Sequence, residues 1–240
     1  MGAFVMLESS GGLRPLSALP SSVPPASRGL LTAVVAAFAA VAVCDLFAVY
    51  TGVRLRGVLD EDMTASNSNF TSAYSLYERA GRFQVFTTVL CGVLFITWFF
   101  LMRRRTGLMA PDQFRMGSGW AIGAWFVPVA NLWLPYRVAL DMWGACSPLP
   151  TGEESRHVPI WPVNLWWGLF AGTALLGRYA AWRLDRDDSL AEFQGSVSLY
   201  LAVDLLYAVT AGAAALFAVR LTALQRLKAT ENPYWTPSGR

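Results

Sequence analysis

Long runs of apolar residues, separated by short polar segments, dominate this 240-residue chain. A helix needs roughly 20 apolar residues to cross the hydrocarbon core of a bilayer, which is about 30 Å thick. Four runs reach that length, and they cover residues 30–53, 83–102, approximately 161–181 and 197–219. The pattern predicts an all-α membrane protein with four transmembrane helices.

A fifth apolar stretch, GWAIGAWFVPVANLWLPYR at residues 119–137, is interrupted in the middle. Pro128 removes a backbone hydrogen bond, and Pro135 disfavours helical angles at the residue before it. Asn131, between the two prolines, would need a polar partner in hydrocarbon. The sequence therefore predicts a proline-broken re-entrant or interfacial hairpin between helices two and three. A kinked fifth crossing of the membrane is the alternative.

The residues after Pro135 show a helical period again. Tyr136, Leu140 and Trp143 share one face, while Arg137 and Asp141 lie four residues apart on another. The segment therefore predicts a helix in the plane of the membrane that ends the hairpin. A solvated Arg137–Asp141 pair is the default interpretation, with a gate as the functional alternative.

Basic residues set the expected orientation, because cytoplasmic loops retain Lys and Arg. One cluster, at 103–105, follows the second run, and another, at 220–228, follows the fourth. With four crossings both clusters face the same side, so both termini are predicted to be cytoplasmic. The expected organisation is a disordered Pro/Ser/Gly-rich arm at 1–28, a transmembrane domain at 29–222 and a tail at 223–240.

Composition narrows the class of protein further. Only 15% of the residues are charged, against roughly a quarter in soluble domains, and the mean hydropathy is +0.40. The net charge of +3 comes from clusters beside apolar runs, which favours membrane orientation over nucleic-acid binding. Cys44, Cys91 and Cys146 are too scattered for a disulfide framework, and His157 has no partner for a metal site. The sequence predicts no cofactor and no metal.

Two carboxylates lie inside apolar runs. Asp45 precedes Arg54 by nine residues and Asp204 follows Ser196 by eight, so both should lie about 12–13 Å below the outer surface. An Asp at a helix centre costs roughly 2.5–3.5 kcal/mol, so each needs a partner within the bundle. Arg178, near the outer end of helix three, is the candidate partner.

Three interpretations of these carboxylates stay open. The first is a structural cluster of Asp45, Arg178 and Asp204 that holds three helices together. The second is a proton or cation pathway, which predicts a water-accessible cavity that reaches both aspartates. In the third, Arg178 extends outward and each Asp is neutral or bonded to a nearby polar group.

Tryptophans are frequent around the hairpin and the start of helix three. Because Trp gathers at membrane interfaces, they are expected to form an aromatic belt rather than a stacking site. The residues in question are Trp133, Trp143, Trp161, Trp166 and Trp167.

The string WAIGAWFVPVANLWLPYRVALDMW, at residues 120–143, resembles the signature of a bacterial membrane family, domain of unknown function 4328. The matching positions are Trp125, Pro128, Asn131, Leu132, Trp133, Pro135, Arg137 and Asp141. The resemblance extends more loosely over approximately 30–222. It implies a multi-pass protein, common in actinobacteria, and implies no reaction.

These observations limit the classes of function that the protein can have, without identifying one. The chain has no phosphate-binding loop, nucleophile elbow, zinc-protease motif or dinucleotide fingerprint, so no enzymatic activity is expected. The leading hypothesis is a non-enzymatic scaffold or regulatory component of the cell membrane that meets protein partners through its tails and hairpin. The alternative is a small transporter or channel subunit that uses Asp45 and Asp204. The oligomeric state stays open.

Overall fold

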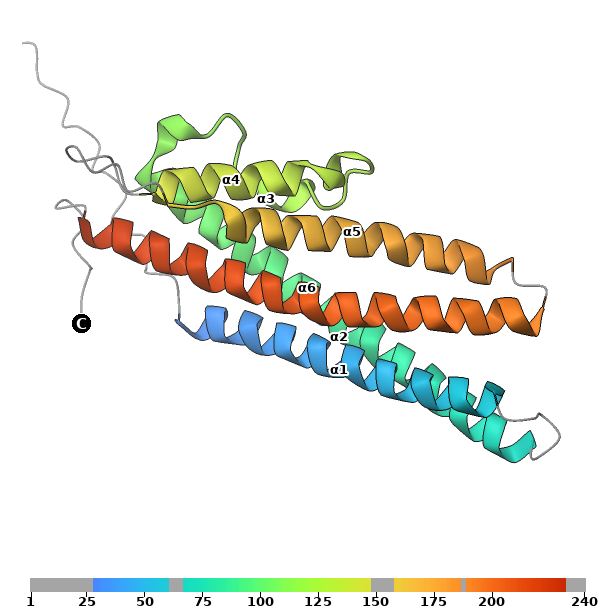
Figure 1. Ribbon diagram of the computed structural model, residues 1–240. Helices are drawn as coiled ribbons and strands as arrows, with labels where there is room; N and C mark the ends of the chain where they lie inside the picture. The colour runs from blue at the N-terminus through green and yellow to red at the C-terminus, as the bar shows by residue number, and fades with distance from the viewer. Residues whose placement is uncertain (1–27, 61–66, 148–157, 187–188, 232–240) are drawn as a thin grey trace, which may run out of the picture.

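The computed structural model describes residues 28–60, 67–147, 158–186 and 189–231. Within these ranges the secondary structure is helical, without strands (Figure 1). The elements in chain order are α1 (Arg28–Asp60), α2 (Asn67–Met109), η1 (Pro111–Gln113), α3 (Trp120–Gly123), η2 (Ala130–Leu132), α4 (Leu134–Cys146), α5 (Trp161–Leu184) and α6 (Leu190–Glu231). The arm predicted at 1–28 lies almost wholly outside the described residues.

The long helices extend well past the apolar runs that predicted them. With 43 residues, α2 is about 65 Å long, roughly twice the thickness of a hydrocarbon core. Its early turns carry an i,i+4 pair, Glu78 with Arg82, in the order that suits a helix. At the start of α6, Glu192 Oε2 accepts hydrogen bonds from both the backbone N–H and the hydroxyl of Ser189, and Ser189 Oγ accepts one from the Glu192 N–H. This capping box begins the helix in the polar segment that precedes the apolar run 197–219.

Four long helices lie side by side along one axis (Figure 1). α1 packs against α2 and α6, and α5 packs against α6, whereas α2 and α5 share no extensive contact. We call the end where α1 begins and α6 ends the terminal end, and the opposite end the far end. In Figure 1 the segment containing α3 and α4 covers the bundle at the terminal end.

The core at the terminal end is aromatic. Trp166 stacks on Phe217 with ring centroids 4.4 Å apart, and Trp98 meets Phe217 edge-on at 6.0 Å. Phe95, 5.6 Å from Trp166, connects α2 to α5. Trp143 is also in this cluster, stacked on Phe217 at 6.4 Å. The prediction of an aromatic belt at the membrane interface was therefore wrong for Trp143, Trp166 and Trp167, which are buried. Trp133 and Trp161 are exposed.

α4 is a core helix rather than a surface helix. Val138, Ala139, Met142 and Cys146 are at most 2% exposed and pack into the aromatic cluster. Figure 1 shows α4 running alongside α5, along the bundle axis. The prediction of an in-plane helix was therefore wrong, because α4 buries most of its surface instead of one narrow face.

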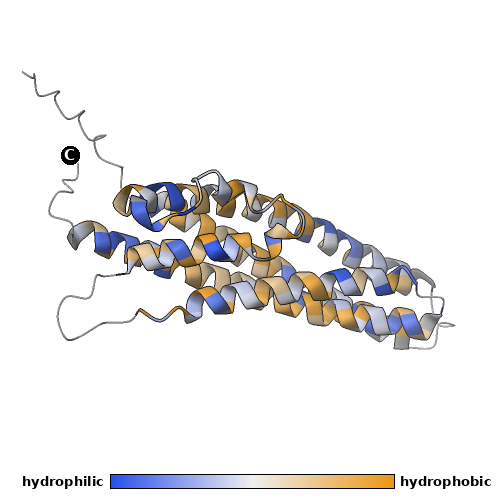
Figure 2. Ribbon diagram, turned by 90° about the horizontal axis from the view of Figure 1, so that it is seen from above, coloured by the Kyte–Doolittle hydropathy of each residue, from blue (hydrophilic) through white to orange (hydrophobic). Residues whose placement is uncertain are grey.

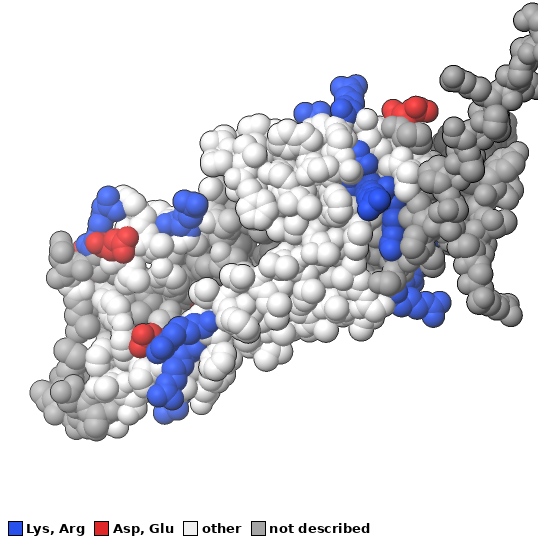
Figure 3. Space-filling view, turned by 180° about the vertical axis from the view of Figure 1, so that it is seen from behind, with Lys and Arg blue, Asp and Glu red and all other residues white. Residues whose placement is uncertain are grey.

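Three described helices are long and apolar enough to cross a membrane: Arg28–Leu59, Asn69–Met109 and Ala191–Thr230. In the most apolar windows of these helices only 17%, 28% and 44% of residues are buried, so their apolar side chains mostly face outward. Figure 2 shows apolar residues along the middle of the long helices, and Figure 3 shows Lys, Arg, Asp and Glu near the two ends. α5 is not among these candidates, since Asn164, Arg178 and its tryptophans lower its hydropathy.

Candidate functional site: a carboxylate pair beside a cavity

Asp45 and Asp204 meet in the structure through a third residue. Asp45 is on α1 and Asp204 on α6, and they are 1% and 6% exposed. The side-chain amide of Gln84, on α2, donates hydrogen bonds to Oδ1 of Asp45 at 2.7 Å and to Oδ1 of Asp204 at 2.8 Å. One amide nitrogen therefore links three helices at a common depth.

Arg178, the predicted partner, is not part of this contact. It is exposed on α5 and, within the described residues, forms no ion pair with either carboxylate. The expected cluster was thus wrong in its third member: an amide occupies the position expected for a guanidinium. The sequence pattern did not single out Gln84, because it is the second residue of its apolar run, where a polar residue normally marks the boundary of the run. Its polar character inside the run was the available signal.

A cavity of about 800 Å³ lies beside the pair, in the half of the bundle toward the far end. Asp45, Gln84 and Asp204 line one part of it. The rest of the lining is mainly apolar and aromatic, and it includes Tyr74, Tyr77, Val85, Val89, Gly177, Val197, Tyr200, Val203 and Tyr207. Pockets of this size and character, with a few converging polar groups, hold small organic ligands.

Glycine shapes one wall of this cavity. A Cβ at Gly177 would lie 3.2 Å from the Tyr207 hydroxyl, so a side chain there would press on the tyrosine. Gly52, deeper between the helices, would place a Cβ 2.5 Å from Cδ2 of Leu201 and 3.3 Å from the Tyr77 ring. Close helix approach at these two glycines sets the positions of the tyrosines around the pair.

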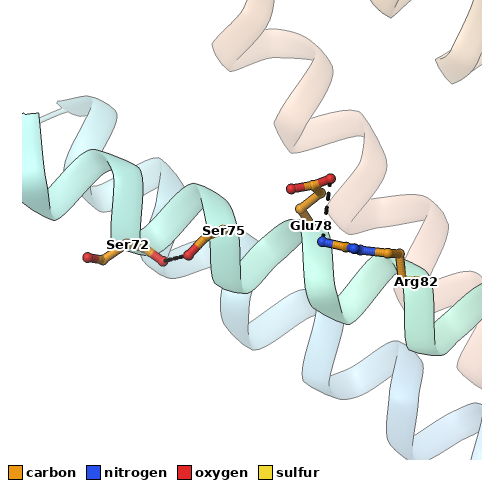
Figure 4. Close-up of polar contacts among 4 residues, drawn as sticks. All are labelled: Ser72, Ser75, Glu78 and Arg82. Atoms are coloured by element: carbon orange, nitrogen blue, oxygen red, sulfur yellow. Dashed lines mark hydrogen bonds and ion pairs between the residues drawn. The ribbon is translucent and has the colours of Figure 1, made fainter.

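Glu78 and Arg82 lie on the cavity lining, one turn apart on α2. Their side chains point toward each other, with Arg82 Nη2 3.6 Å from Glu78 Oε1 (Figure 4). Nearby, the Ser75 hydroxyl donates to the backbone carbonyl of Ser72 at 3.0 Å (Figure 4). The side chains of Arg82 and Glu78 are 70% and 57% exposed, so this pair marks the outer edge of the cavity.

The carboxylate pair has an unmet bonding requirement. Oδ2 of Asp45 is buried and has no hydrogen-bond partner within the described part of the chain. Asp204 is a like charge close to Asp45, and no Lys or Arg of the described residues forms an ion pair with either carboxylate. A buried carboxylate is costly unless it is paired, so the geometry favours a bound cation or proton. The described residues contain no group of three or more His, Cys, Asp or Glu suited to a metal ion.

The signature residues of the hairpin have separate structural roles. Trp125 is partly buried and its ring meets Phe95, Trp166 and Phe170 edge-on or tilted at 5.8, 6.4 and 5.8 Å. Pro135 is buried in the first turn of α4, the helix position that proline suits best. These residues fix the hairpin to the core.

The tip of the hairpin is a tight turn. The Ala130 N–H donates to the Pro128 carbonyl at 2.7 Å, and Val129 between them has φ of 65°. This is a γ-turn in a region that a β-branched residue adopts only under strain. Asn131 continues the turn through its backbone N–H, which donates to Val127 O at 3.0 Å. Exposed apolar side chains surround this tip, namely Phe126, Val127, Val129, Leu132 and Trp133.

Arg137 and Asp141 do not form a direct ion pair in the described structure. Arg137 is exposed, while Asp141 is half-buried. Burial raises the pKa of Asp141 above its usual range, and Arg137, Arg103 and Arg115 oppose that shift. Arg103 itself donates to the Met116 carbonyl at 2.6 Å and lies 3.5 Å above the Phe114 ring, so it holds the segment that leads into the hairpin.

The hairpin begins and ends at the same end of the bundle. Cys146 Sγ, at the close of α4, lies 3.7 Å from Thr106 Oγ1, near the close of α2. Gln225 Nε2 on α6 donates to the same Thr106 hydroxyl at 3.0 Å, and Lys228 Nζ donates to the Ser147 carbonyl at 3.0 Å. The ends of α2, α4 and α6 therefore meet at the terminal end.

Comparison with known proteins gives one match. Residues 61–223 match a family model described as Domain of unknown function (DUF4328). The match includes Gln84, Asp204 and the hairpin, but it begins after α1 and so excludes Asp45, whereas the expected likeness began near residue 30. No curated protein matches the chain. No solved structure matches it either.

Proposed function

The chain belongs to the family called domain of unknown function 4328, and we propose that it is a non-enzymatic membrane protein that binds a cationic ligand beside Asp45 and Asp204. One observation carries the proposal. Two buried carboxylates share a single amide donor on the wall of a cavity, and one carboxylate oxygen has no protein partner. A cation in the cavity would offset the like charges of the two carboxylates, which have no basic partner among the described residues.

This geometry favours the transporter or channel-subunit hypothesis over the scaffold hypothesis. The cavity reaches both aspartates, as a pathway requires. At the terminal end, packed rings that include Trp98, Trp166 and Phe217 fill the bundle. The described helices thus enclose a cavity at one end and a packed aromatic core at the other, an asymmetry that a binding site in one state of alternating access would have.

The same proposal includes a topology. α1, α2, α5 and α6 are four crossings of a bacterial plasma membrane, and the hairpin with α3 and α4 is re-entrant from the terminal end. The meeting of Cys146 with Thr106 and of Lys228 with Ser147 supports this arrangement. In it the apolar tip around Phe126 contacts lipid, and the basic residues at 103–105 and 220–228 are cytoplasmic.

Cation binding is tested by thermal unfolding of the purified protein in nanodiscs. Sodium, potassium and tetraethylammonium chlorides are titrated against wild type, Asp45→Asn/Asp204→Asn and the control Asp141→Asn, which removes a carboxylate elsewhere. An Asn oxygen still accepts from Gln84, so the double variant keeps the bridge and is expected to fold. At a ligand concentration of 100 times Kd, binding adds about 2.7 kcal/mol of stability.

We expect at least one cation to raise the Tm of wild type and of Asp141→Asn, and to leave the double variant unchanged. Equal shifts in all three proteins, or no shift in wild type, would overturn the proposal. Topology is tested separately with single cysteines at Arg104 and Ser147 in a variant without the three native cysteines. Labelling of the two positions from opposite sides of the membrane would exclude the re-entrant hairpin.

A further inference from the structure

The cavity has an open apolar side. Val85 and Val89, on α2, line the cavity and yet are 66% and 62% exposed. Gly177 and Leu184, on α5, line it from the opposite helix. α2 and α5 have no extensive contact, and the rings that connect them, Phe95 and Trp166 among them, lie farther toward the terminal end. The cavity therefore opens sideways between α2 and α5, at a level where the surface is apolar.

The size of the cavity selects the class of ligand. A volume of about 800 Å³ is within the range of sites for small organic molecules and is far larger than a dehydrated metal ion requires. Two carboxylates and one amide are also too few ligands for a hard divalent cation, which takes six or more oxygens. An inorganic ion would leave most of the apolar lining without contact.

The polar and aromatic groups select the charge and shape of the ligand. Tyr77, Tyr200 and Tyr207 line the cavity together with the two aspartates. Tyrosine faces attract organic ammonium groups, and the carboxylates supply the opposite charge. The apolar side of the cavity, formed by residues such as Val85 and Val89, would accept an alkyl arm.

We propose that the ligand is an amphiphilic organic cation, an ammonium headgroup with an alkyl arm, which enters from the bilayer through the opening between α2 and α5. The headgroup lies against Asp45, Asp204 and the tyrosines, and the arm lies along Val85 and Val89. This inference rests on the proposed cation binding and adds the class of ligand and its route.

The test compares three probes in nanodiscs by calorimetric titration: octyltrimethylammonium, tetramethylammonium and octanesulfonate. The first has headgroup and arm, the second the headgroup alone, and the third the arm with the opposite charge. The proteins are wild type, Asp45→Asn/Asp204→Asn, Val89→Trp and Val93→Trp. Val93 is exposed one turn beyond Val89 on α2 but does not line the cavity, so its variant controls for a large side chain at this surface.

We expect octyltrimethylammonium to bind wild type at least ten times more tightly than tetramethylammonium, because its arm buries apolar surface. Octanesulfonate should show only lipid partitioning. Asp45→Asn/Asp204→Asn should lose the specific binding, and Val89→Trp should weaken it at least ten-fold while Val93→Trp leaves it unchanged.

Each other outcome has a definite meaning. Tetramethylammonium binding as tightly as the octyl compound would overturn this inference and leave the proposed function standing. Specific binding that survives in the double Asn variant, or no binding of any cation, would overturn both. Equal effects of Val89→Trp and Val93→Trp would refute the lateral route. If the native mass of wild type corresponds to two chains and that of Val89→Trp to one, a second copy of the protein fills the opening, and the lateral route is refuted.

Discussion

Replacing Gln84 by Leu tests the central contact of the site. The substitution keeps a side chain of similar size on α2 and removes the donor shared by Asp45 and Asp204. Hydrogen bonds to charged acceptors contribute about 1.5–3 kcal/mol each, so two at the lower value give a loss of about 3 kcal/mol. Polar contacts between membrane helices average only about 0.6 kcal/mol each, so the two hydrogen bonds together set a lower limit of about 1 kcal/mol on the loss.

The assay is equilibrium unfolding by SDS in mixed micelles, followed by tryptophan fluorescence. A double-mutant cycle repeats Gln84→Leu in the Asp45→Asn/Asp204→Asn background, where the acceptors are neutral and each bond contributes about 1 kcal/mol. The coupling between the two changes should therefore be about 1 kcal/mol. A loss below about 0.5 kcal/mol in wild type would refute the bridge between the three helices. Equal losses in the two backgrounds would refute charged acceptors at Asp45 and Asp204.

Three further changes probe the bundle near the site and the hairpin at the terminal end. Gly52→Val should destabilise the bundle by about 1–3 kcal/mol in the same SDS assay, because its Cβ already overlaps Leu201; an unchanged midpoint would contradict the close approach. Val129→Gly should stabilise by about 1 kcal/mol, because glycine adopts the positive φ without strain, and a lower Tm would refute the γ-turn. Burial raises the pKa of Asp141, so the folded state binds its proton more tightly and stability falls as the pH rises through that pKa. Asp141→Asn should therefore flatten the curve of Tm against pH in the acidic range. An unaltered slope would contradict the raised pKa.

The sequence determined the class of protein because membrane crossing depends on local composition. Apolar runs of about 20 residues and clustered basic residues are sufficient for that prediction, and three of the four predicted helices are long and apolar enough by the structure as well. That the remaining helix, α5, crosses the membrane stays a prediction. The signature around Trp125 and Pro135 was likewise sufficient for the family, which the match over 61–223 confirms.

The tertiary structure alone decided which polar groups meet. The depth of a residue along a helix can be counted from the sequence, so Asp45 and Asp204 could be placed at one level. The rotation of each helix about its axis cannot be read from the sequence. That rotation turns Arg178 outward and Gln84 inward, and it buries Trp143 and Trp166 in a core instead of at an interface. The packing of α2 against α1 and of α5 against α6 also leaves α2 apart from α5, where the cavity lies. These features depend on contacts between residues far apart in the chain, which no local pattern specifies.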